Sequence, residues 1–208
     1  MNKVIYQAYP HFYGKMQQFV KENETIKNCD ICFVGDSIIE MMDVNNFNNQ
    51  FCVNRGISSD KSAGVLMTLQ DRVIAIHPKK VFINIGTNDI CDGYTISQIK
   101  ANYIDIIEML TENLKGVEIV ITTIMPPCYY DGPHIDHAYM DCRDILRIEE
   151  LNKIIKTFDS LYDNVKVADG YQALADENKS LRLEDTLDGV HLTLSGYEKL
   201  KKEISKYL

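Results

Sequence analysis

Two residues near the end of the chain are of types that carry out acid–base chemistry. In the stretch DTLDGVHLTLSGYEKL, Asp188 lies three residues before His191. A histidine oriented by an acid can act as the general base for a nucleophile. Asp185 also lies near His191, but the D-x-x-H spacing favours Asp188 as the orienting acid. The alternative is a surface histidine beside an unrelated acid.

The candidate nucleophile is Ser37, in the stretch VGDSIIEMM. It follows an apolar run that ends in glycine, and a helical pattern begins directly after it. A serine at a helix N-terminus lies where free N–H groups favour developing negative charge. Taken alone, however, the short GDS triplet is more typical of a helix N-cap, at Asp36 or at Ser37.

Two further segments supply candidate hydrogen-bond donors. Gly56, in NRGISSD, lets the backbone approach a ligand closely and can turn its N–H toward it. Asn88, in IGTNDI, offers side-chain N–H groups that need no proton transfer, which suits an oxyanion. Their ordinary explanations are a turn glycine before a helix and an Asx-turn. The case for a site therefore depends on where the chain places all these residues together.

The elements that must position these residues alternate between strand and helix. Apolar runs typical of buried parallel strands lie at 30–35, 51–54, 80–86, 117–124 and 165–169. Helical patterns lie at 60–76, 96–114 and 143–162, and a last helix is expected to begin at Ser195. Thr95 with Gln98, and Ser195 with Glu198, fit capping boxes.

This alternation predicts an α/β fold in which an open, five-stranded parallel sheet carries helices on both faces, in a single domain over 1–208. In such sheets ligands bind at the carboxyl ends of the strands. Ser37, Gly56 and Asn88 each follow a strand, and the Asp188–His191 pair comes after the fifth. All of them are therefore expected at one edge of the sheet.

Composition narrows the functional classes further. The 208 residues are 45% hydrophobic and 25% charged, with a formal net charge of −8, which gives no electrostatic reason to bind nucleic acid or an anionic membrane. The N-terminus has no signal-peptide h-region, and no apolar run is long enough to span a bilayer. We therefore expect a cytoplasmic protein whose cysteines are thiols: Cys29, Cys32, Cys52, Cys91, Cys128 and Cys142.

Two cysteine-containing segments invite a metal interpretation. CDIC, residues 29–32, has the C-x-x-C form but leads into a strand and has no second pair to complete a zinc site. The long polar loop MPPCYYDGPHIDHAYMDC holds Cys128, His134, His137 and Cys142, at spacings that match no zinc pattern. We expect no metal and no cofactor, and a mobile loop that forms a wall over the site.

The four candidate segments resemble the sequence blocks of the SGNH, or GDSL-type, hydrolases. They occur in order over residues 31–197, as FVGDSIIE, NRGISSDKSAGVL, GTND and DGVH, with Ile38 where the family name has leucine. The NRGIS and IGTND segments are most similar to the branch that contains platelet-activating-factor acetylhydrolase-like and carbohydrate acetylesterase proteins. The G-x-S-x-G elbow of α/β-hydrolases is absent.

The resemblance implies a three-layer α/β/α sandwich, flavodoxin-like, and a serine esterase. Ser37 would be the nucleophile, His191 the general base and then acid, and Asp188 the residue that orients His191. The oxyanion would be bound by the Ser37 and Gly56 backbone N–H groups and by the Asn88 side chain. The substrate would be a small-molecule ester that carries a short acyl group, particularly acetyl, on a carbohydrate or lipid-like alcohol.

Other functions fit the same residues. A lysophospholipase or a thioesterase would use the same triad. A non-catalytic, flavodoxin-like module that binds flavin would use the helix N-termini but leave Ser37, Asn88, Asp188 and His191 without a role. The acyl pocket is expected from residues 127–142 and from the loops after the first and third strands. The sequence does not fix the oligomeric state.

Overall fold

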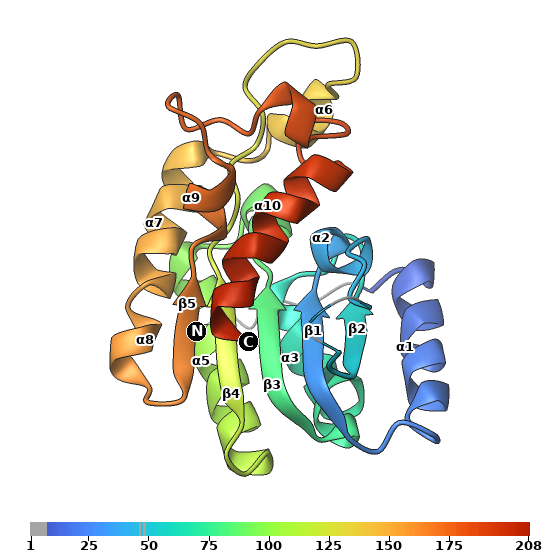
Figure 1. Ribbon diagram of the computed structural model, residues 1–208. Coiled ribbons are helices and arrows are strands. Elements are labelled where there is room, and N and C mark those ends of the chain that lie inside the picture. Colours follow the sequence, from blue (N-terminus) through green and yellow to red (C-terminus); the bar gives the residue numbers. More distant parts are fainter. Residues whose placement is uncertain (1–7, 46, 48) are drawn as a thin grey trace.

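Five parallel strands form a single sheet in the computed structural model, which describes residues 8–45, 47 and 49–208 (Figure 1). Their order across the sheet is β2-β1-β3-β4-β5, so the direction of winding reverses between β1 and β3. The predicted five-stranded parallel sheet is confirmed. The strands are β1 Cys29–Gly35, β2 Cys52–Gly56, β3 Pro78–Asn84, β4 Glu118–Thr122 and β5 Val165–Ala168.

Helices cover both faces of this sheet. The α-helices are α1 Pro10–Glu22, α2 Ser37–Glu40, α3 Ser62–Arg72, α4 Thr87–Cys91, α5 Ile96–Asn113, α6 His137–Met140, α7 Ile145–Ile155, α8 Phe158–Leu161, α9 Gly170–Leu174 and α10 Leu194–Ile204. Single turns of 3₁₀-helix lie at Ile74–Ile76, Leu183–Asp185 and Ser205–Tyr207. This arrangement is the predicted three-layer sandwich.

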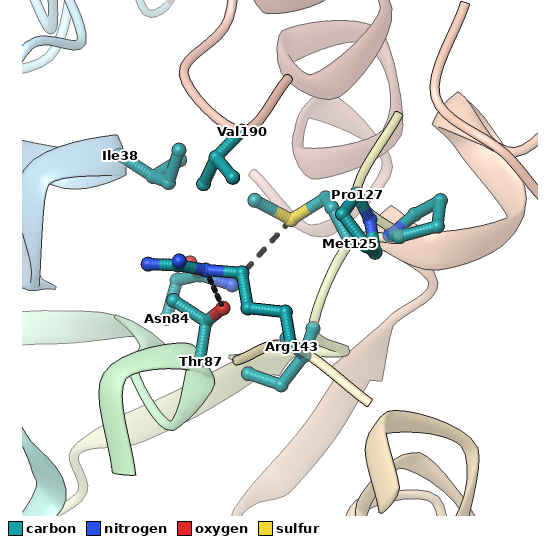
Figure 2. Close-up of a pocket in the computed structure, with 9 residues that line it drawn as sticks. Ile38, Asn84, Thr87, Met125, Pro127, Arg143 and Val190 are labelled. Carbon is teal, nitrogen blue, oxygen red and sulfur yellow. Dashed lines mark hydrogen bonds between the residues drawn. The ribbon is translucent and has the colours of Figure 1, made fainter. Parts of the chain in front are cut away.

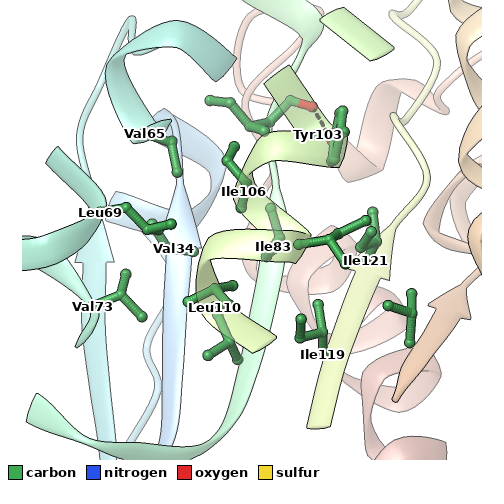
Figure 3. Packing of buried hydrophobic residues seen from close by; sticks show 14 of the residues in the cluster. Val34, Val65, Leu69, Val73, Ile83, Tyr103, Ile106, Leu110, Ile119 and Ile121 are labelled. Carbon is green, nitrogen blue, oxygen red and sulfur yellow. Dashed lines mark hydrogen bonds between the residues drawn. The ribbon is translucent and has the colours of Figure 1, made fainter. Parts of the chain in front are cut away.

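Each face of the sheet has its own apolar core. On one face, strand residues such as Val34, Ile83 and Ile121 pack against Leu69 of α3 and Ile106 of α5 (Figure 3). These side chains are fully buried, and burial stabilises the fold by about 1.5–3 kcal/mol per large aliphatic side chain. The other face packs against α2 and α10, through Phe33, Phe82, Ile38, Tyr197, Leu200 and Ile204.

The carboxyl ends of the central strands are held close together. A side chain at Gly35 would place its Cβ 2.0 Å from the Asn84 carbonyl oxygen, so β1 and β3 can meet there only through a glycine. The buried guanidinium of Arg72 donates to the Gly35 and Arg55 carbonyls, both at 2.7 Å, and pairs with Asp60. These contacts fasten β1 to β2 at the edge where the candidate residues begin.

Two helix boundaries differ from prediction. The helix expected over 143–162 ends at Ile155, because the Ile154 carbonyl accepts both the N–H and the hydroxyl of Thr157, and α8 follows as a separate turn. The Ser195 capping box is wrong. Thr193 is the N-cap of α10 and accepts from the Gly196 N–H at 3.3 Å.

The Thr95–Gln98 capping box before α5 is confirmed by reciprocal hydrogen bonds. No helix in the described part of the chain combines the length and the apolar character needed to cross a membrane.

Candidate active site

Ser37 is the first residue of α2, directly after the carboxyl end of β1. Asp36 is the N-cap, and its Oδ1 accepts from the Ile38 N–H at 3.0 Å. The N–H of the first helical residue has no partner within a helix, so the Ser37 N–H is available beside its own hydroxyl. The N-cap explanation and the nucleophile hypothesis are thus compatible, because they concern adjacent residues.

His191 joins Ser37 to Asp188. Its Nε2 lies 2.9 Å from Ser37 Oγ, although 154 positions separate the two residues, and its Nδ1 lies 2.5 Å from Asp188 Oδ2. An ionised carboxylate can only accept, so Nδ1 carries the ring proton and Nε2 is left to accept the Ser37 hydroxyl. In this tautomer His191 can take a proton from Ser37.

The local backbone holds Asp188 as an anion. Its Oδ1 accepts from the Val190 N–H at 3.0 Å and from the His191 N–H at 2.8 Å. Burial by itself raises the pKa of Asp188, but the hydrogen bonds from the His191 ring and from these two N–H groups outweigh it and leave the pKa below its ordinary value. Asp188 therefore stays ionised and keeps the His191 ring in one orientation.

Asn88 lies in the first turn of α4, after β3. Its Nδ2 donates to the Asp60 carbonyl at 3.0 Å, and its Oδ1 accepts from Nη2 of Arg143 at 3.0 Å. An amide nitrogen has two N–H groups, so one remains for a ligand. Asp89, beside it, is buried and accepts from the Ser62 N–H and hydroxyl, which makes it a structural residue.

The structure places Gly56 with its N–H already engaged. That N–H donates to Asn54 Oδ1 at 2.8 Å. A Cβ at Gly56 would lie 2.1 Å from the Glu40 backbone nitrogen, so the glycine serves the close approach of β2 to α2. The segment that reaches Asn88 is instead the following turn, in which Ser59 has a φ of 60° and Asp60 accepts from Asn88.

Sequence reasoning missed two residues of the site, Arg143 and Tyr139. Arg143 is buried and contacts both Thr87 and Asn88. Tyr139 of α6 packs its ring edge-on against His191, with 5.7 Å between ring centroids. Tyr139 lies inside the 127–142 loop that was expected to form a wall, and Arg143 lies one residue beyond it. The sequence therefore predicted the loop but gave no signal for these two side chains.

A small cavity is lined by the chain neighbours of Ser37 and His191, although these two residues do not line it themselves. Figure 2 shows Ile38 and Val190, the neighbours of these two residues, facing Arg143 and Thr87 across it. Its volume is about 10 Å³, on a measure by which one water molecule needs about 10–15 Å³. The 127–142 loop contributes only its first residue, since the lining comprises Ile38, Asn84, Thr87, Ile124, Met125, Pro126, Pro127, Arg143 and Val190.

The loop after β4 is fixed to the segment that carries the Asp188–His191 pair. The Cys128 N–H donates to the Gly189 carbonyl at 2.7 Å, and the Asp136 N–H donates to the Asp188 carbonyl at 2.8 Å. In this conformation the loop is a wall of the site, because backbone hydrogen bonds hold it at both places.

The expectation that all six cysteines are thiols is wrong for two of them. Cys91, at the end of α4, and Cys142 form a disulfide, with Cα atoms 4.5 Å apart. The prediction rested on the inferred compartment, and the fold brings together residues 51 positions apart. Cys29, Cys32, Cys52 and Cys128 are free, and burial raises the pKa of Cys29 to about 12, so the CDIC segment holds unreactive thiols.

Three of the four remaining histidines have side-chain contacts away from Ser37, and the fourth, His77, ends the 3₁₀ turn before β3. His11 bonds to Glu40, His134 to the Leu183 carbonyl, and His137 pairs with Asp131. Within the described residues, no cluster of three or more histidine, cysteine or acidic side chains is arranged to hold a metal ion.

Asp36 is an unusual neighbour of the candidate nucleophile Ser37. It is fully buried, and its Oδ2 has no hydrogen-bond partner among the described residues. Burial raises the pKa of Asp36 to about 7, assisted by Asp60 and Asp89 and opposed by the Ile38 N–H and by Arg143. A carboxyl group whose neutral form is favoured by burial far more than that of an exposed aspartate thus lies directly before Ser37.

Comparison with known proteins adds independent information. The family model described as the GDSL-like Lipase/Acylhydrolase family matches residues 33–199. Platelet-activating factor acetylhydrolase IB subunit alpha2 of Homo sapiens is 23% identical over 190 residues, which cover 88% of this chain and 77% of that protein. Its Gallus gallus counterpart is 21% identical over 218 residues, covering 97% and 89%.

Solved structures show the same architecture. A protein from Streptococcus pneumonia superposes with a TM-score of 0.87 at 26% identity, over 95% of this chain and 92% of that one. It is described, provisionally, as a platelet activating factor. The acetylxylan esterase of Geobacillus stearothermophilus superposes with a TM-score of 0.67 at 17% identity, over 87% and 94%. At that identity the likeness concerns the fold alone.

Proposed function

Because the chain belongs to the GDSL-like lipase/acylhydrolase family and is accordingly a carboxylic ester hydrolase, we propose that it removes short acyl groups, acetyl in particular, through a triad of Ser37, His191 and Asp188. The observation that carries this proposal is the continuous pair of hydrogen bonds from Ser37 Oγ through the His191 ring to Asp188 Oδ2. This geometry gives each of the three side chains a chemical task.

In the first step Ser37 Oγ attacks the ester carbonyl while His191 Nε2 takes the hydroxyl proton. Asp188 stabilises the imidazolium that forms and does not take the proton itself. The carbonyl oxygen becomes an oxyanion, for which the Ser37 N–H and the spare Asn88 N–H are the proposed donors. Each such donor contributes about 3 kcal/mol to transition-state stabilisation.

The Gly56 N–H, the third expected oxyanion donor, is occupied by another hydrogen bond in this structure. It serves as a third donor once it leaves Asn54 Oδ1, to which it is bonded at 2.8 Å. The proposal therefore rests on the Ser37 and Asn88 donors.

The tetrahedral intermediate then collapses: the bond to the alcohol breaks, His191 gives its proton to the leaving alcohol, and an acyl-Ser37 ester remains. Water then enters, is deprotonated by the same Nε2, and attacks the acyl carbonyl. Collapse of this second tetrahedral intermediate releases the carboxylic acid and restores the Ser37 hydroxyl. No cofactor is required for either step.

The size of the cavity supports the assignment to short acyl groups. Its volume of about 10 Å³ is at the lower limit for one water molecule, and its apolar lining residues Ile38, Met125 and Val190 suit a small group such as the methyl of an acetyl ester better than a long chain. Longer chains would have to displace the side chains of Ile38, Val190 or Met125. The word acetylhydrolase in the name of the mammalian relatives points the same way.

The small cavity also bears on the alternatives. A lysophospholipase would have to accommodate a long acyl chain, which a cavity of this volume does not favour. A thioesterase that acts on acetyl thioesters fits the pocket equally well and is distinguished by assay. Family membership as an ester hydrolase leaves no support for the flavin-binding module.

A panel of p-nitrophenyl esters with acyl chains of two to about eight carbons would test the proposal, with the wild type and Ser37→Ala as the matched pair. We expect the acetate to be hydrolysed fastest and Ser37→Ala to be inactive on every ester. A fluorophosphonate probe should label the wild type at Ser37 only. A wild type that hydrolyses none of the esters would overturn the proposal.

A further inference from the structure

We propose that Arg143 is a positioning residue which holds the Asn88 amide in the one orientation that offers an N–H to the oxyanion, an inference that rests on the proposed function. Nη2 of Arg143 donates to Asn88 Oδ1 at 3.0 Å, while Asn88 Nδ2 donates to the Asp60 carbonyl at 3.0 Å. Figure 2 shows the Arg143 side chain beside Thr87 at the cavity.

These two contacts exclude the flipped amide. A flip would place Asn88 Oδ1 against the Asp60 carbonyl and Nδ2 against the guanidinium of Arg143, so that two acceptors and two donors would face each other. Without Arg143, only the Asp60 contact would oppose rotation of the amide. The arginine therefore supplies the second point that fixes the amide plane.

The guanidinium is itself held on three sides. Nε donates to Thr87 Oγ1 at 3.0 Å, Nη1 donates to the Tyr139 carbonyl, and Nη2 donates to Asn88. Thr87 and Asn88 are consecutive residues of α4, so two nitrogens of one guanidinium bind the helix turn that carries the proposed oxyanion donor. A planar group with this many contacts keeps its own orientation.

The burial of Arg143 is difficult to explain by stability alone. Its relative exposure is 8%, and its hydrogen-bond acceptors are neutral: Thr87, Asn88 and the Tyr139 carbonyl. The charges of Asp36 and Asp188 offset part of the cost of burying this cation, but neither carboxylate is among its hydrogen-bond partners in the described part of the structure. Its positive charge next to the amide that binds the oxyanion gives it a reason to be there.

A disulfide also connects the segments that carry Arg143 and Asn88. Cys142 directly precedes Arg143, and Cys91 lies three residues after Asn88 on α4. The disulfide between them therefore ties the loop that carries Arg143 to the helix that carries Asn88. Both the hydrogen bonds and the disulfide join the same two segments.

The competing interpretation is that Arg143 binds an anionic group of the substrate directly. Its Nε and both Nη atoms already donate to protein acceptors, which leaves little capacity for a carboxylate or phosphate. The two interpretations differ in kinetics. Loss of a substrate contact raises KM, whereas loss of an oriented oxyanion donor lowers kcat.

A double-mutant cycle on the acetyl ester tests the proposal, using wild type, Arg143→Met, Asn88→Ala and the double variant. We expect Arg143→Met to lower kcat by about tenfold or more, with KM changed by less than about threefold. In the Asn88→Ala background the same substitution should lower kcat by less than about twofold, because the amide it positions is gone. Equal losses in both backgrounds, or a rise in KM alone, would contradict the proposal.

Two further variants keep the test decisive. Arg147→Met is the matched control, because Arg147 also donates to this region, at the Ile90 and Tyr94 carbonyls, without touching Asn88. It should lower the melting temperature and leave kcat within about twofold. Arg143→Lys keeps the charge but not the fork, so kcat should remain low even when the variant is fully folded; recovery to the wild-type kcat would overturn the positioning role.

Failure of this inference differs from failure of the proposed function. If the wild type hydrolyses no ester, the proposed function falls and the inference falls with it. If the wild type is active and the cycle is additive, only the role of Arg143 is lost.

Discussion

Ser195 donates its hydroxyl to Asp185 Oδ1 at 2.7 Å, and so engages away from His191 the acid that the sequence offers as an alternative to Asp188. Asp185 is fully buried and also pairs with Lys199. Asp188→Asn should lower kcat by about 10⁴-fold, because an amide favours the wrong imidazole tautomer. Asp185→Asn should lower the melting temperature and keep kcat within a few-fold of wild type. The reverse pattern, measured by steady-state kinetics and thermal unfolding, would reassign the orienting acid.

Replacement of Asn88 tests the oxyanion donor. Asn88→Ala should lower kcat by about 10²–10³-fold, since one donor in a site of this kind is worth about 3 kcal/mol. The melting temperature should change little, because the lost contacts reach one carbonyl and one guanidinium. Near-normal turnover by a folded variant would rule out this role for Asn88.

The walls of the cavity are expected to set acyl-chain preference. Val190→Ala enlarges the cavity next to His191, so the rate on p-nitrophenyl butyrate relative to acetate should rise by about tenfold or more. Val165→Ala is the control, because Val165 is equally a buried valine but lies in β5 and does not line the cavity. A ratio that moves equally in both variants would show that the effect is not one of pocket size.

The buried carboxyl of Asp36 predicts a pH dependence of stability. Its pKa is about 7 in the fold against an ordinary 3.8, so the folded state binds this proton more tightly than the unfolded state. The stability that it contributes is complete below pH 3.8 and is lost as the pH rises toward 7. Asp36→Asn cannot ionise, so its melting temperature relative to wild type should be higher at pH 8 than at pH 4.

Asp30 provides the control of opposite sign. Hydrogen bonds from the Lys79 ammonium and the Phe51 N–H lower the pKa of Asp30, so its contribution is present above its ordinary pKa and lost as the pH falls. Asp30→Asn should therefore become less stable relative to wild type at pH 8 than at pH 4. Parallel trends in the two variants would contradict the assignment for Asp36.

The disulfide can be checked by counting thiols. The denatured protein should show four reactive thiols before reduction and six afterwards. Cys142→Ser should lower the melting temperature, because a link that spans 51 residues restricts the unfolded chain by about 4 kcal/mol in the chain-entropy model. Cys52→Ser, which removes a free thiol, serves as the comparison. Six thiols without reductant would exclude the bond.

The features that the sequence predicted well are those set by local pattern. The strands follow from Val- and Ile-rich runs, and the contact between Asp188 and His191 follows from a spacing of three residues. Arg143 and the Cys91–Cys142 bond depend on how the loop after β4 folds back over α4, which no local pattern records. The Ser195 capping box was mispredicted for the same reason. The Ser195 hydroxyl makes a tertiary hydrogen bond to buried Asp185 and does not cap the helix.

The proposed nucleophile, Ser37, and its proposed base, His191, are synthesised far apart in time because 154 positions separate them. Every strand of the sheet ends by Ala168, well before His191, and the last helix returns to the first βα junction, where the Tyr197 hydroxyl donates to the Ile38 carbonyl at 2.9 Å. During synthesis the sheet and Ser37 therefore emerge first, with no base to activate the serine. The Asp188–His191 pair and the α10 helix that covers one face of the sheet are thus the last parts of the molecule to be synthesised, and the proposed ester cleavage has to wait for them.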